Sequence, residues 1–200
     1  MIVDNTFLVT ASIVYHVDLA MQACKRLSIT ASNARALAIQ AGDAAAGFRP
    51  LTDYINRFAI VTKSSSHRIN HLACDLSHIA AEKDISDRAI NHIEYVYRSA
   101  QDATYIHSLD PVKARTKQHQ KDLQHSYEEQ LRELSSELNS LSDELRSADI
   151  VVTMSRIEAL QAKGPHQNAL NNVADNVEEV TASVKKLIDD AKRLVNRLKK

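Results

Sequence analysis

Glycine and proline are scarce in this chain and mark three narrow stretches, a distribution that constrains the fold more than any other feature. Three glycines and three prolines occur among 200 residues. Glycine commonly ends helices, and proline disfavours helical backbone at the residue before it. Helix breaks are therefore predicted near residues 47–50, 108–111 and 164–165. The helical segments left between these breaks are 7–46, 51–107, 112–163 and 166–200.

Apolar residues recur three and four apart along each segment, which is the heptad spacing of coiled-coil helices. The register is cleanest in the last segment, where it comprises Leu170, Val173, Val177, Val180, Val184, Leu187, Ala191, Leu194 and Leu198. In the third segment it comprises Tyr127, Leu131, Leu134, Leu138, Leu141, Leu145, Ala148 and Val152. The register of the second segment includes four polar residues, which are Thr62, Ser65, Lys83 and Ser86. The first segment ends in small register positions, including Ala31, Ala34, Ala38, Ala41 and Ala45, which implies close helix approach.

Short connections between long helices place consecutive helices antiparallel. We therefore predict an all-α fold, a long antiparallel four-helix bundle that runs up, down, up and down as one domain over residues 1–200. It consists of two coiled-coil hairpins, 7–107 with its turn at 47–50 and 112–200 with its turn at 164–165. Both hairpin tips fall at one end of a rod, and each middle helix spans roughly 80 Å at about 1.5 Å per residue.

The charge balance and the cysteine count narrow the classes of partner and compartment. Twenty-five acidic residues cancel 25 basic residues, so the chain has no bulk attraction for nucleic acid or anionic lipid. Two cysteines do not make a disulfide framework. The apolar stretch from Phe7 to Val17 is interrupted by polar residues and is too short for a membrane span or signal peptide. We expect a cytoplasmic chain with no membrane span and no nucleic-acid partner.

The residues around the first predicted turn carry a motif. From Asn33 to Gly47 the chain reads Asn-Ala-Arg-Ala-Leu-Ala-Ile-Gln-Ala-Gly-Asp-Ala-Ala-Ala-Gly, and Phe48 follows. This stretch resembles the signalling-tip hairpin of bacterial methyl-accepting chemotaxis receptors, in which Asn-x-x-Ala-Leu-Asn-Ala-Ala-x-Glu-Ala-Ala-Arg-Ala-Gly precedes a glycine-rich turn and a Phe. The matching positions are Asn33, Ala36, Leu37, Ala44, Ala46 and Gly47, with Phe48 if the turn is shortened. The family's polar tip residues are replaced by Ala38, Gly42 and Ala45.

A fainter copy of the same pattern surrounds the second predicted turn. Residues 156–162 read Arg-Ile-Glu-Ala-Leu-Gln-Ala, and residues 172–180 read Asn-Val-Ala-Asp-Asn-Val-Glu-Glu-Val. These runs are similar to the receptor segments Ile-Glu-Ala-Ala-Arg-Ala and Val-Val-Ala-Asp-Glu-Val, with the Glu kept as Glu158. Receptors of this family pair two identical hairpins in a homodimer. We therefore interpret each half of the chain as one diverged copy of the hairpin, fused into a pseudo-dimer.

The resemblance implies a non-enzymatic signal-transduction or scaffold protein that acts through its hairpin tips. Its expected partners are proteins, such as a chemotaxis kinase or its coupling adaptor. The candidate contact residues are Asn33, Leu37, Gly47, Phe48, Arg49 and Glu158. The chain would act as a monomeric pseudo-dimer or as a homo-oligomer. Two other functions stay open, a metal- or small-molecule-sensing bundle and a structural coiled-coil spacer.

One group of side chains has the composition of a metal site. His67, His71, Cys74 and His78 are spaced four, three and four apart on one predicted helix, and such residues can bind zinc. The heptad register places them on the solvent face, which favours an exposed histidine-rich surface over a site with ligands His67, His71 and Cys74. No catalytic arrangement or phosphate-binding loop is legible, so no enzyme activity and no cofactor are expected.

Overall fold

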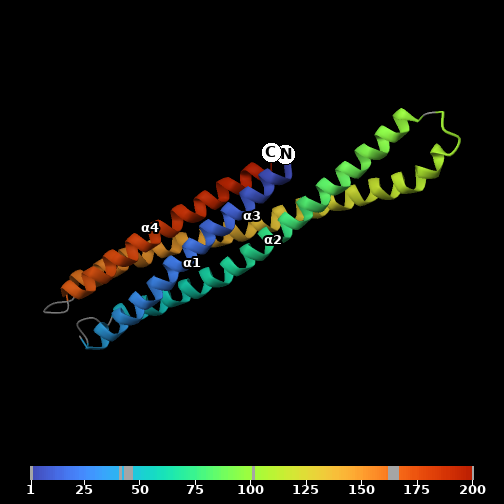
Figure 1. The fold of residues 1–200 in the computed structure, drawn as a ribbon. Helices are drawn as coiled ribbons and strands as arrows, with labels where there is room; N and C mark the ends of the chain where they lie inside the picture. The colour runs from blue at the N-terminus through green and yellow to red at the C-terminus, as the bar shows by residue number, and fades with distance from the viewer. Residues whose placement is uncertain (1, 41, 43–46, 101, 162–166, 200) are drawn as a thin grey trace.

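The computed structural model describes residues 2–40, 42, 47–100, 102–161 and 167–199. Its elements are α1 (Ile2–Gln40), α2 (Phe48–Ser99), the short 3-10 helix η2 (Ile106–Leu109), α3 (Asp110–Gln161) and α4 (Gln167–Leu198). No strand occurs in the described ranges. Helix α1 packs against α2 and α4, and α3 packs against the same two helices. The predicted all-α, antiparallel four-helix bundle is therefore confirmed (Figure 1).

The four helices form a rod in which two long helices outreach two shorter ones. Helices α2 and α3 have 52 residues each, whereas α1 has 39 and α4 has 32. The end of α1, the start of α2, the end of α3 and the start of α4 lie together at one end (Figure 1). The two chain termini lie side by side along the rod, and α2 and α3 continue past them as a two-helix hairpin (Figure 1).

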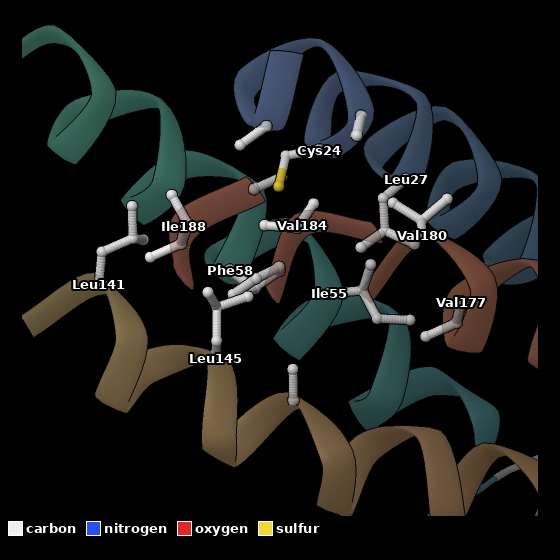
Figure 2. Packing of buried hydrophobic residues seen from close by; sticks show 14 of the residues in the cluster. Cys24, Leu27, Ile55, Phe58, Leu141, Leu145, Val177, Val180, Val184 and Ile188 are labelled. Carbon is white, nitrogen blue, oxygen red and sulfur yellow. The ribbon is translucent and has the colours of Figure 1, made fainter. Parts of the chain in front are cut away.

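Most of the predicted heptad residues form the core, but in α4 Ile188 and Val195 are buried, whereas the predicted Leu187 and Leu194 are only partly buried. Leu134, Leu138, Leu141 and Leu145 of α3 are at most 1% exposed. In α2 the polar register residues Thr62, Ser65 and Ser86 are buried as well. Figure 2 shows Cys24, Leu27, Ile55, Phe58, Leu141, Leu145, Val177, Val180, Val184 and Ile188 pointing into one shared interior from all four helices.

Helix α2 buries a further row of residues that the two-position heptad pattern did not include. Thr52, Ala59, Ser66, Ala73 and Ala80 recur every seven residues and are all buried. Because α2 packs against both α1 and α3, it needs a wider buried stripe than a two-stranded coiled coil does. The small side chains in this row allow the neighbouring helices to approach α2 closely.

The first break lies earlier in the chain than the predicted 47–50, because residues 48–50 already belong to α2. Helix α1 ends at Gln40 rather than near 46. Gly42 has a φ of +62°, a left-handed conformation that glycine adopts at little cost just after a helix. Helix α2 begins at Phe48, and Pro50 falls within its first turn, where its missing N–H is not needed. The predicted positions Ala41, Ala44, Ala45 and Ala46, together with Gly164 and Pro165, lie outside the described residues.

The predicted end of α2 near residue 107 is wrong. The helix ends at Ser99, and residues 102–105 form a turn that leads into η2. This stretch includes Asp102, Thr104 and Tyr105, which have low helix propensity, and neither α1 nor α4 packs there. Because tertiary packing is absent here, helix propensity determines where α2 ends.

Polar contacts replace the apolar seam in the two-helix hairpin. Lys117 Nζ of α3 lies 3.5 Å from Glu94 Oε1 of α2. Lys113 Nζ lies 4.5 Å from the centre of the Tyr97 ring, a cation–π contact. Polar contacts of this kind tolerate water, as is expected in a section of the rod that contains only two helices.

Candidate functional site

The two hairpin tips touch through Gly47 and Glu158. Gly47 precedes the first residue of α2 and offers no side-chain cap, and the first turn of α2 contains no acidic residue. The Glu158 carboxylate of α3 occupies the space that a Cβ on Gly47 would fill. A negative charge is favourable there because helix N-termini carry a partial positive charge. Two predicted tip residues from different hairpins are thus brought together.

Phe48 lies inside the tip, not on its surface. Its side chain is 0% exposed and belongs to the core cluster, and Leu37 is partly buried against the same cluster. The prediction that the Phe48 side chain contacts a partner needs correction, because no face of the ring is accessible. An aromatic residue directly after the turn instead anchors the start of α2 to the core.

Asn33 and Arg49 are exposed near the tips, as a partner surface requires. Beside them, Arg35 of α1 and Asp53 of α2 form an ion pair with Nη1 and Oδ1 2.8 Å apart. Both partners of this pair are more than half exposed. The described residues on both sides of the first turn therefore present polar and charged side chains.

The second hairpin is closed by Arg156 near its tip. Arg156 of α3 bonds to Glu178 of α4, and its Nη2 lies 3.1 Å from Asp175 Oδ1. The hydrogen bond and charge of Glu178, with a smaller contribution from Asp175, raise the pKa of Arg156. One further hydrogen bond, from Thr30 Oγ1 of α1 to Asn176 Oδ1 over 3.3 Å, joins α4 to the first hairpin.

An apolar stripe on the outer face of α3 was not foreseen. Ile150, Met154, Ile157 and Leu160 are 67%, 41%, 41% and 68% exposed, and their spacing of four, three and three keeps them on one side of the helix. They fall in the last part of α3, next to Glu158. The signal in the sequence was a second apolar series offset from the core register. Such contiguous apolar surface commonly marks an interaction site.

The histidine stripe lies on the outer face of α2. His67, His71, Cys74 and His78 are all exposed, as the register predicted. Among the described residues, no three His, Cys, Asp or Glu side chains converge tightly enough to hold a metal ion. The two cysteines are free, with Cys24 buried and Cys74 exposed.

The core offers little room for a bound small molecule near the tips. A cavity lined by Leu27, Tyr54, Phe58 and Val177, among others, measures about 10 Å³. That volume is about what one water molecule requires, whereas ligand pockets hold roughly 300–1,000 Å³. This cavity therefore cannot receive a cofactor without rearrangement of the bundle.

Comparisons with known proteins find no relative of this chain. No family model, no curated protein and no solved structure matches the chain. The fold and its surfaces define an all-α four-helix bundle with paired hairpin tips. Any assignment of a function to this bundle is a proposal.

The composition of helix α1 is relevant to the prediction that the chain has no membrane span. Of the described helices, it alone is long and apolar enough to cross a membrane, with a mean hydropathy of 1.4 over its most apolar window in Thr6–Gln40. Of that window, 39% is buried inside the bundle. A core helix of a bundle has the same composition, so the absence of a span stays a prediction.

Proposed function

We propose that this chain is a non-enzymatic interaction module of signal transduction, similar to the cytoplasmic part of a chemotaxis receptor. The proposal rests on one observation above others, the placement of both hairpin tips at the same end of one rod. A protein partner can then contact both tips at once. The resemblance of residues 33–48 to the receptor tip supports the same proposal.

The surface of the tips is suited to a protein partner. Exposed polar residues, Asn33 and Arg49, flank the first tip, and the apolar stripe Ile150, Met154, Ile157 and Leu160 flanks the second. Protein interfaces commonly combine an apolar centre with a polar rim. A chemotaxis-type kinase or its coupling adaptor is the proposed partner.

Signals would pass along the rod as small helix shifts. Register positions near the tips hold small residues, and Ala31, Ala34, Ala38 and Ala159 are all 0% exposed. Small side chains interlock less deeply than leucines, so neighbouring helices can slide by an ångström or two between packed arrangements. The contact of Glu158 with Gly47 would couple such shifts in one hairpin to the other.

A binding experiment with matched variants tests the proposal. The full chain is titrated against a purified chemotaxis kinase and a coupling adaptor by biolayer interferometry. Asn33→Ala, Arg49→Ala and Met154→Asp are expected to weaken binding. Asn91→Ala and Arg115→Ala, exposed residues of the two-helix hairpin, are expected to leave it unchanged. Equal binding by all five variants, or no binding by the unmodified chain, would refute the tip as a docking surface.

A further inference from the structure

A histidine-lined hollow lies between α2 and α3, away from the tips. His67 and His71 of α2 line it together with Arg68, and Glu133 and Glu137 line it from α3. The two histidines are four residues apart, so they lie one turn apart on the same face of α2. At about 1.5 Å per residue, they are roughly 30 Å along α2 from its start. The hollow therefore joins the first hairpin to the second at mid-rod.

Asp75 forms a hydrogen bond with the ring of His71. His71 Nδ1 lies 2.7 Å from Asp75 Oδ2, one turn further along α2. An ionised carboxylate only accepts hydrogen bonds, so Nδ1 carries the proton and donates it. The lone pair of the neutral ring is then on Nε2. Metal-ligating histidines commonly donate their second ring N–H to a carboxylate in this way.

The charges around the hollow favour a cation. Arg68 is its positive group, and its Nη2 lies 2.6 Å from Glu137 Oε1, so the two charges cancel. Glu133 on the lining and Asp75 behind His71 are left as negative groups. Cys74 and His78 continue the stripe but do not line this hollow.

We propose that His67 and His71 bind a borderline divalent cation, Zn²⁺ or Ni²⁺, through one ring nitrogen each. Imidazole nitrogens suit both ions, and Zn²⁺ also accepts carboxylate ligands. Glu133, which lines the same hollow from α3, supplies a third ligand once its side chain turns toward the histidines, and water fills the remaining positions. Glu133 belongs to α3, so the bound ion links the two hairpins. This site is independent of the tip function proposed above.

Calorimetry on the full, untagged chain tests the site. The chain is freed of metal with a chelator and titrated with ZnCl₂ and, separately, NiCl₂. One ion per chain is expected, and His67→Ala and His71→Ala are each expected to abolish binding. Asp75→Asn is expected to weaken binding by about tenfold, the lower range for a residue that orients a metal ligand. Circular dichroism checks that each variant keeps its helices.

Matched variants make the outcome decisive. His92 is exposed on the same helix and has no histidine three or four residues away, so His92→Ala is expected to bind as the unmodified chain does. Cys74→Ser is expected to do the same. Binding that persists in the His67→Ala/His71→Ala double variant, or no binding by the unmodified chain, overturns the site. Unchanged affinity in Glu133→Gln overturns the link between hairpins.

Discussion

The carboxylate of Glu158 on α3 fills the space beside Gly47 in which a side chain at that position would begin. The φ of −67° at Gly47 suits any residue, so the glycine is needed for this approach and not for its backbone conformation. Gly47→Ala is expected to push the carboxylate away and to lower the free energy of unfolding by about 0.3–1 kcal/mol, the scale of a charge at a helix N-terminus. Urea unfolding measures the change.

A double-mutant cycle shows whether the two residues act together. In a Glu158→Ala background the carboxylate is already gone, so Gly47→Ala is expected to cost less than it does in the unmodified chain. Equal costs in both backgrounds would mean that Gly47 and Glu158 contribute independently, and the coupling between tips would lose its basis.

Phe48→Ala is expected to destabilise the bundle by about 3–5 kcal/mol, because it removes a fully buried aromatic side chain and leaves a cavity. Phe7→Ala provides the control, since Phe7 is 61% exposed and its loss is expected to change stability by less than about 0.5 kcal/mol. Thermal or urea unfolding measures both. A mild effect of Phe48→Ala would mean that the ring spends time outside the core.

The ion pair between Arg68 and Glu137 predicts a specific dependence of stability on pH. Burial opposes ionisation of Glu137, but hydrogen bonds from Arg68 and Ser65 and the charge of Arg68 outweigh it, so the pKa lies below the ordinary 4.5. A lowered pKa in the folded state means that the contribution is complete well above pH 4.5. It is lost as the pH falls below 4.5 through the folded value.

Glu137→Gln isolates this contribution. The unmodified chain is expected to lose about 0.5–1 kcal/mol more than the variant between pH 6 and the acid side of this window, a range set by solvent screening of the exposed Arg68. Asp143→Asn is the control, because Asp143 pairs with Arg146 at 3.6 Å and both are largely exposed. Urea unfolding at each pH measures the losses, and parallel curves for the chain and Glu137→Gln would contradict the prediction.

The core was predictable from the sequence because the heptad spacing of apolar residues can be recognised without knowing where each helix begins and ends. Leu134 and Val177 occupy predicted register positions and are buried in the structure. The end of α2 was not predictable in the same way, since apolar residues such as Ile106 continue past Ser99. The helix ends where residues of low helix propensity, such as Asp102 and Thr104, follow in a section that α1 and α4 do not cover.

The candidate site was only partly predictable. The motif led to Gly47 and Glu158, but their contact depends on the level at which α3 lies against α2, and that level is set by packing along the whole rod. The same motif suggested Phe48 as a surface residue, whereas packing at the turn draws it inside. Ile150 and Ile157 could have been found, because they repeat at heptad spacing on a second face of α3.

The two-helix hairpin predicts uneven protection of the backbone. The parts of α2 and α3 that continue past the chain termini depend on polar contacts such as Lys117 with Glu94. Their amide protons are expected to exchange with solvent faster than those of residues 131–152, which lie in the section of the rod that all four helices form. Hydrogen exchange read by mass spectrometry measures this. Equal protection along α3 would show that another surface covers the hairpin.

The two cysteines predict a stepwise reaction with a thiol reagent. Burial raises the pKa of the Cys24 thiol to about 11, whereas Cys74 is exposed. At pH 8 about one Cys24 in a thousand would be thiolate, and the thiolate is the reactive form. Ellman's reagent is therefore expected to modify one thiol per folded chain quickly and the second only after unfolding.

Single substitutions assign the two steps. Cys74→Ser is expected to remove the fast reaction, and Cys24→Ser is expected to keep it and to lose the slow one. Because Cys24 of α1 is buried in the core next to Thr62 of α2, its reaction rate in the folded chain reports how often these two helices separate. Two fast thiols per folded chain would mean that the first hairpin opens readily, and a signal could then travel by separation of α1 from α2 rather than by sliding.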